Sequence, residues 1–233
     1  MKSIARMGII AIFVALCALA ISGCGGASDS SDSGLIKDTS ESAEWGTTLQ
    51  FKVKSGWEKA GSSESTAYYL QTMYTDNSGN PMLNISLENP NSSTYGQNLT
   101  NSYDDWKEYV SQYYSRTSQQ MADVLNEAMG VSAGSSAAYN ADMFPSYLNY
   151  SCTELDDATS HDKTYKLYKV SYDYEWTDAG YEDIKSKNSQ IQKSGHSDEY
   201  YALLKDGTYD VEIITEQSEA LLRDFVGTLN ISN

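Results

Sequence analysis

The sequence predicts an α+β fold with a largely antiparallel sheet, and three observations lead to this class. Apolar and polar residues alternate in several short runs, which is typical of half-buried strands. These runs are paired locally across segments rich in turn-forming residues, as in antiparallel hairpins. Two segments with helical spacing are separated by most of the predicted strands, so helices and strands do not alternate as they do around a parallel sheet.

The first predicted strand follows Trp45. Leu49, Phe51 and Val53 alternate with polar residues up to Ser55-Gly56. Such alternation is typical of a strand with one buried face, and we expect the globular part of the chain to begin here.

A hairpin is predicted next, over residues 68–87. Aromatic and β-branched residues fill 68–75, turn-forming residues occupy 76–81, and Leu83, Ile85 and Leu87 alternate with polar residues. Two extended runs around a dense turn segment indicate paired antiparallel strands.

Helical spacing extends over 103–129, after a helix-start signal formed by Ser102 and Asp105. One helix over this whole range would be about 40 Å long at ~1.5 Å per residue, which is long for a chain of this size. We therefore predict two helices with a break at 116–118, followed by a loop of small residues at 130–136.

The strongest strand pattern in the chain is 165–176, with Leu167 on one face and large residues on the other. A further strand is predicted at 147–155, and 156–162 is interpreted as an acidic turn between the two. The polar segment 178–197 matches neither a helix nor a strand pattern. The face of strand 165–176 opposite Leu167 consists of Tyr168, Val170, Tyr172, Tyr174 and Trp176.

A hairpin and a helix are predicted to close the chain. Strands at 200–204 and 209–213 flank Asp206-Gly207, a dipeptide typical of a type I′ turn. We expect Thr215 to cap a final helix that ends at Gly227. The apolar face of this helix consists of Leu221, Leu222, Phe225 and Val226.

The first 23 residues have the pattern of a secretory signal. Lys2 and Arg6 form a basic start, and Met7–Ser22 carries no charge. As a helix that run would be about 24 Å long, which is short for a bilayer core of about 30 Å. We therefore interpret residues 1–23 as a signal peptide, with an uncleaved N-terminal anchor helix as the alternative.

The stretch Ile21-Ser22-Gly23-Cys24 resembles the lipobox of bacterial lipoproteins. The resemblance implies that Cys24 receives a diacylglycerol and becomes the N-terminus of the mature protein. Fatty acyl chains such as palmitate would then hold the protein on the extracytoplasmic face of the cell membrane, because each buried methylene contributes about 0.8 kcal/mol.

The rest of the chain is expected to comprise a linker and one domain. Residues 24–44 are interpreted as the lipidated cysteine and a flexible linker, because Ser, Gly and Asp dominate there. Residues 45–233 are expected to form a single globular domain. Cys17 would leave with the signal, so Cys152 has no intramolecular disulfide partner, and we interpret it as a small buried hydrophobic residue.

The chain is acidic, with 32 Asp and Glu residues against 16 Lys and Arg and a net charge of −16 at pH 7. This charge argues against binding of nucleic acid and against adsorption to anionic lipid, since both need a basic surface. The partners that we expect are the membrane, through the lipid on Cys24, and a protein or carbohydrate ligand. The domain itself is expected to be a monomer.

Two stretches of the globular part are similar to the PsbP-like and DcrB-like lipoproteins. One is the strand and Gly-Trp pair over 45–57, and the other is the closing order of strand, Asp-Gly turn, strand and helix, which ends in Phe225-Val-Gly-Thr-Leu-Asn-Ile231. The resemblance implies a curved antiparallel sheet covered by helices, as in a PsbP-like α/β/α sandwich. It also implies that Trp57 is buried beneath the covering helices and that the closing hairpin supplies central or near-central strands. Ser55 stands where that family usually has a proline, and no functional residue of the family can be carried over.

Residues that could support catalysis or metal binding form no recognised motif. His161 lies among the acids of 156–162, but the ligand spacing of a zinc or calcium site is missing. The sequence also lacks nucleophile-elbow, P-loop and dinucleotide motifs, so we assign no catalytic, metal or cofactor residue. Two acids for glycoside hydrolysis can lie far apart in sequence, which leaves an enzyme possible.

The aromatic content is the most informative functional signal, with 19 Tyr and 4 Trp. Tyrosine combines an apolar ring with a polar tip, which suits binding surfaces, although we expect most of these rings to lie on both faces of the sheet and only a few to form a binding patch. The predicted function is a lipid-anchored cell-surface protein that acts as a non-catalytic binding or accessory module. The alternative is a cell-envelope hydrolase acting on carbohydrate or cell-wall material. A solute-binding transporter component is a third possibility, but the chain is small for its two-lobed form.

Overall fold

The computed structural model describes most of the chain after the predicted signal. The predictions for residues 1–23, for Cys24 and for Gly207 concern positions outside the described residues. No helix in the described part is both long and apolar enough to cross a membrane. The described ranges are 35–42, 46–60, 64–65, 69–89, 103–132, 134–187, 191–206 and 208–232.

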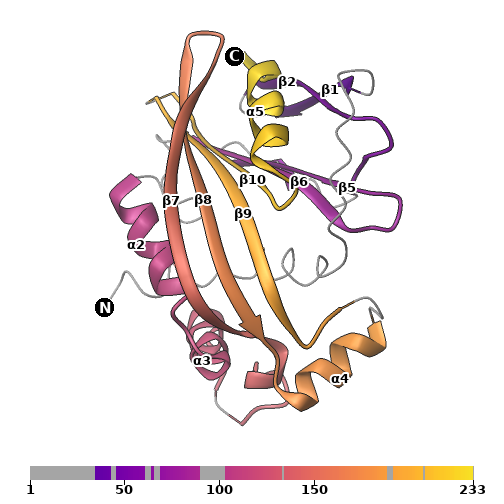
Figure 1. Cartoon of the computed structure of the whole chain (residues 1–233), viewed down its shortest axis with the longest axis vertical. Coiled ribbons are helices and arrows are strands. Elements are labelled where there is room, and N and C mark those ends of the chain that lie inside the picture. The colour runs from indigo at the N-terminus through magenta and orange to yellow at the C-terminus, as the bar shows by residue number, and fades with distance from the viewer. Residues whose placement is uncertain are drawn as a thin grey trace. The chain divides into compact units, whose positions relative to one another are not determined.

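Two β-sheets dominate the structure, and the strand pairs with a determined register are antiparallel (Figure 1). The larger sheet has eight strands in the order β3-β5-β6-β10-β9-β8-β7, with β4 paired to β5, and the smaller has the order β1-β2-β11. The predicted α+β class with a large antiparallel sheet is therefore confirmed. The strands are β1 (Leu35–Ser42), β2 (Thr47–Lys54), β3 (Glu58–Lys59), β4 (Glu64–Ser65), β5 (Tyr69–Thr75), β6 (Pro81–Glu88), β7 (Ser146–Ser160), β8 (Lys163–Glu175), β9 (Ser194–Lys205), β10 (Asp210–Thr215) and β11 (Asn230–Ser232).

The helices include the predicted broken pair. Thr117 caps α3 through a capping box with Gln120, and Gly130 ends that helix in the left-handed conformation, with φ of 65°. The break therefore has a local cause, because Thr117 takes an extended backbone while its hydroxyl accepts the N–H of Gln120. The helices are α2 (Tyr103–Tyr113), α3 (Ser118–Met129), the short 3-10 helix η1 (Ala141–Met143), α4 (Asp178–Lys187) and α5 (Glu219–Thr228).

The described chain divides into two compact units. Unit 1 contains residues 103–152 and 171–198, and unit 2 contains residues 35–89, 153–170 and 199–232. Strands β7, β8 and β9 run side by side, and each contributes residues to both units (Figure 1). The single domain over 45–233 stays a prediction.

The core of unit 2 contains the residues that the alternation in β2 marked as buried. Leu49, Phe51 and Val53 are each at most 2% exposed, and Phe51 packs against Phe225 of α5 with ring centroids 5.3 Å apart. Strand β2 thus turns its apolar face toward the helix. Further core members are Leu70, Tyr74, Leu83, Ile85, Leu87, Tyr165, Leu167, Ala202, Leu204, Val211, Ile213, Leu222 and Val226.

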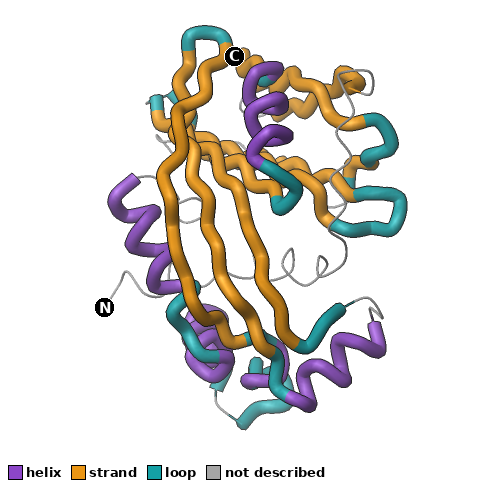
Figure 2. Tube along the Cα trace, in the orientation of Figure 1, coloured by secondary structure: helices purple, strands orange, loops and turns teal. Residues whose placement is uncertain are grey.

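The type I′ turn predicted for the β9–β10 hairpin is found at the β7–β8 connection instead. The closing hairpin forms, but Lys205 pairs with Asp210, so its loop has four residues instead of a two-residue type I′ turn. The tight turn joins β7 to β8 instead, where His161 and Asp162 have φ of 45° and 67° (Figure 2). Positive φ at both central positions is what a type I′ turn requires. The interpretation of 156–162 as an acidic turn is therefore wrong, because β7 continues to Ser160.

The start of the final helix also differs from the prediction. Ser218 caps α5, and its hydroxyl accepts the N–H of Leu221 at 3.1 Å. Thr215 is instead the last residue of β10, where its hydroxyl donates to the carbonyl of Met82 at 2.7 Å. Serine and threonine are both favourable N-cap residues. Because β10 extends to Thr215, the helix begins later and Ser218 is its N-cap.

Part of the range predicted as a linker is a strand. Residues 35–42 form β1, which pairs with β2 from Leu35 opposite Lys54 to Ser42 opposite Thr47. The flexible-linker interpretation therefore does not hold for this range. Backbone hydrogen bonds to a neighbouring edge stabilise such a strand, and a side-chain pattern does not reveal them.

Two single-residue expectations are also corrected. Trp57 is only partly buried, although it packs against the core of unit 2, and Cys152 is partly exposed instead of buried.

The unassigned segment 178–197 contains α4 and the first residues of β9. Strands β9 and β10 occupy central positions in the large sheet, as predicted for the closing hairpin.

The core of unit 1 is a cluster of tyrosines. Tyr114, directly after α2, stacks on Tyr172 of β8 with ring centroids 4.3 Å apart. Tyr113 and Tyr147 lie beside them, and Tyr150 stacks on Tyr114 at 5.8 Å. The tyrosines of this cluster therefore pack against one another in the core of unit 1.

Candidate functional site

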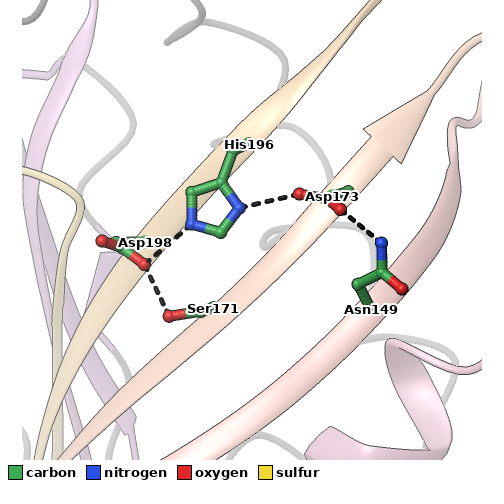
Figure 3. A network of polar contacts seen from close by, with 5 residues as sticks. All are labelled: Asn149, Ser171, Asp173, His196 and Asp198. Carbon is green, nitrogen blue, oxygen red and sulfur yellow. Dashed lines mark hydrogen bonds and ion pairs between the residues drawn. The ribbon is translucent and has the colours of Figure 1, made fainter.

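One face of the sheet in unit 1 carries a connected set of polar side chains. Tyr172 points toward the tyrosine cluster, and side chains alternate along a strand, so Ser171 and Asp173 lie on the opposite face of β8. His196 and Asp198 of β9 and Asn149 of β7 join them there (Figure 3). We call these five residues the polar face.

A local irregularity in β7 brings Asn149 into this set. Tyr147 and Tyr150 both pack into the tyrosine cluster, although strict alternation would place them on opposite faces. Asn149 lies between them with φ of 52°, a left-handed conformation that asparagine tolerates better than most residues. The alternation shifts at this point, as in a β-bulge, and the side chain of Asn149 is directed to β8.

Hydrogen bonds connect all five residues (Figure 3). Asn149 Nδ2 donates to Asp173 Oδ2 at 2.6 Å, and Asp173 Oδ1 lies 2.8 Å from His196 Nδ1. On the other side of the ring, Nε2 lies 3.3 Å from Asp198 Oδ1, which also accepts the hydroxyl of Ser171 at 2.6 Å. The imidazole is therefore held between two carboxylates.

The electrostatics favour a charged histidine. The hydrogen bond with Asp173 raises the pKa of His196 against the opposing effect of burial, and the charge of Asp198 adds to the rise. Hydrogen bonds from Asn149 and from His196 lower the pKa of Asp173. The imidazole is 59% exposed, so this pairing takes place at the surface and ionic strength weakens it.

The arrangement of Ser, His and Asp here is not that of a hydrolytic triad. In a triad the serine hydroxyl donates to the histidine, and the acid holds the other ring nitrogen. Here Ser171 donates to Asp198, and both nitrogens of His196 face carboxylates. In this arrangement neither ring nitrogen accepts the serine hydroxyl.

A second set of acids lies in unit 2, on the face of the large sheet away from the core. Glu88 is directly opposite Asp210 in the β6–β10 register, and Glu212 is opposite Ser86. Glu88 and Asp210 are 0% and 3% exposed, so a polymer substrate could not reach them without a rearrangement. They therefore do not provide the accessible pair of carboxylates that glycoside hydrolysis needs.

The residues that the sequence singled out lie apart from the polar face. His161 is at the turn that joins β7 to β8, and Cys152 lies beside Tyr150, whose pKa is raised by burial and by the neighbouring thiol. Among the described residues, no group of three or more His, Cys, Asp and Glu side chains is placed to hold a metal ion. His196 was not predicted from the sequence, where its i, i+2 spacing from Asp198 on a strand was the available signal.

Two large apolar side chains of unit 1 are exposed, and one of them, Leu148, precedes Asn149 in the edge strand β7. Leu148, next to Asn149, is 48% exposed, and Met143 of η1 is 47% exposed. These are the exposed large apolar side chains of the described chain. A polar network beside an exposed leucine is a combination found in binding surfaces.

Comparisons with known proteins found similarity among solved structures. No protein-family model matches the chain, and no curated protein matches it. A solved structure that resembles it is that of cyanobacterial PsbP (CyanoP) from Synechocystis sp. PCC 6803, with 10% sequence identity and a TM-score of 0.41. The match covers 91% of this chain and 99% of that chain.

Proposed function

We propose that this protein is a lipid-anchored, PsbP-like binding or accessory module on the extracytoplasmic face of a bacterial cell membrane. The lipobox-like stretch ending at Cys24 supports the anchor. The polar face, with Leu148 beside it, is the proposed binding surface, and its ligand is a protein or a carbohydrate.

The bridging of His196 by two carboxylates is the observation that carries the non-catalytic part of the proposal. A general base needs a free ring nitrogen within reach of the proton that it removes. Both nitrogens of His196 already have carboxylate partners, at 2.8 and 3.3 Å. Such a network presents hydrogen-bonding groups in a defined arrangement, which suits recognition.

Site-specific crosslinking in intact cells tests the surface. A photoreactive residue at Leu148 should capture a specific partner, whereas the same residue at Gln119, an exposed position on α3, should not. Asp173→Asn combined with Asp198→Asn should reduce the crosslink at Leu148. Equal crosslinking at both positions, or a crosslink that the double variant leaves unchanged, would contradict the proposal.

A labelling experiment tests the anchor separately. Cys24→Ala should retain the signal and take up no labelled palmitate, because the acylated thiol is missing. Normal incorporation of palmitate in that variant would show that Cys24 is not the site of lipid attachment.

The alternative function is a cell-envelope hydrolase, for which Asp173 and Asp198, both partly exposed, are the candidate pair of acids. Hydrogen bonds from Asn149 and from His196 lower the pKa of Asp173, which disfavours it as the acid that protonates a leaving group. Incubation with purified cell-wall glycan distinguishes the two functions. Release of new reducing ends that Asp173→Asn abolishes would favour the hydrolase.

A further inference from the structure

His196 has one more hydrogen-bond partner than its neutral form can satisfy. A neutral imidazole has one N–H donor and one lone pair, whereas the imidazolium has a donor on each nitrogen. Asp173 and Asp198 are acceptors when ionised, and they face Nδ1 and Nε2. In the observed geometry the charged ring can therefore donate a hydrogen bond to each carboxylate, whereas the neutral ring can donate to only one of them.

We propose that His196 is a proton-controlled switch on the polar face, in which the imidazolium joins Asp173 of β8 to Asp198 of β9. When the proton leaves, Asp198 is the partner released. The contact of Nε2 with Asp198 is the longer of the two, at 3.3 Å against 2.8 Å for Nδ1 with Asp173. Asp198 also keeps a second donor, the hydroxyl of Ser171 at 2.6 Å.

The charged groups around the ring determine the direction of the switch. Asp198 faces it from β9 and Asp173 faces it from β8, while Asn149 of β7 is uncharged and reaches it only through Asp173. Loss of the proton removes the positive charge between the two carboxylates, so the polar face becomes more negative. The switch goes beyond the proposed binding function and does not depend on it.

The pH range follows from the raised pKa of His196. Its ordinary value is 6.5, and the hydrogen bond with Asp173 moves it upward. A group whose pKa is higher in the folded than in the unfolded state stabilises the fold at pH values below the unfolded pKa. The stabilising contribution of the bridge is therefore complete below about 6.5 and is lost as the pH rises through the folded pKa.

Nuclear magnetic resonance of the full-length lipoprotein in detergent, with labelled histidine, tests the switch. The chain has 2 histidines, so His161→Gln assigns the resonances. We expect a pKa above 6.5 for His196 and, in the neutral form, a proton on Nδ1. Asp173→Asn should lower the pKa of His196 more than Asp198→Asn does.

The matched control is Asp123→Asn, which removes an exposed acid from α3 in the same unit. It should leave the pKa of His196 nearly unchanged, because salt screens charges that are far apart at the surface. A pKa of His196 at or below 6.5 in the unsubstituted protein, or a neutral ring protonated on Nε2, would overturn the proposal. These two measurements need no variant of the polar face, so misfolding of Asp173→Asn cannot obscure them.

Discussion

Gly180 allows a direct test of how tightly α4 packs against η1. A Cβ added at this position would lie 2.4 Å from the carbonyl oxygen of Asp142 and 3.0 Å from the hydroxyl of Thr177. Ordinary carbon–oxygen contacts are about 3.3–3.6 Å, so the helix would have to move by about 1 Å. The obstacle is backbone, and a side-chain rotation cannot remove it.

The size of the effect follows from two opposing contributions. Alanine in place of glycine in a helix stabilises it by about 0.5–1 kcal/mol. Overpacking typically costs about 1–3 kcal/mol, and the short distance to Asp142 favours the upper part of this range. We therefore expect Gly180→Ala to lower the free energy of unfolding by about 1–2 kcal/mol.

Urea denaturation of the purified protein measures this difference, and Gly227→Ala is the matched control. Gly227 is also helical, in α5, but a Cβ there would meet no atom within 4 Å. The same substitution should therefore leave that variant as stable as the unsubstituted protein or more stable by up to about 1 kcal/mol. If Gly180→Ala raises the urea midpoint as Gly227→Ala does, α4 does not approach η1 as closely as described.

Two further predictions concern the core and the closing turn. Phe225→Ala removes a ring that is 3% exposed and should lower the free energy of unfolding by about 3–5 kcal/mol. Trp57→Ala should lower it by less, because Trp57 is only partly buried. Equal urea midpoints for the two variants would contradict this ranking. Burial opposes ionisation of Asp206, but hydrogen bonds from Lys163 and from the backbone of Tyr209 outweigh it and lower its pKa. Its contribution to stability is therefore present above the unfolded pKa of about 3.9 and is lost as the pH falls through the folded value. Asp206→Asn should accordingly show a smaller loss of stability than the unsubstituted protein between pH 7 and pH 3, and an unchanged loss would exclude this role for Asp206.

Features with a local cause could be predicted from the sequence. The alternation of Leu49, Phe51 and Val53 identified a buried face because side chains on a strand point to opposite sides in turn. The break between α2 and α3 was predictable because Thr117 and Gln120 form a capping box within one helical turn. The buried face and the helix break both depend on residues that are only two or three positions apart in the chain.

The exchange of the two turns shows where local signals become insufficient. Asp206-Gly207 and His161-Asp162 lie between strands, and the former is the stronger type I′ signal. Strand register decides which loop is tight, and that register depends on the neighbouring strands β6 and β8. The partial burial of Trp57 likewise depends on its packing against the core of unit 2, whose members come from distant parts of the chain.

The sequence by itself determined the α+β class, the closing hairpin and the broken helix pair, because hydrophobic periodicity and the signals for turns and helix ends act over a few residues. The tertiary structure alone decided which polar residues meet. Asn149, Asp173 and His196 come from three strands, and a left-handed residue in β7 is needed to bring the first of them to the other two. Sheet pairing sets such distances, and no spacing within the chain encodes them.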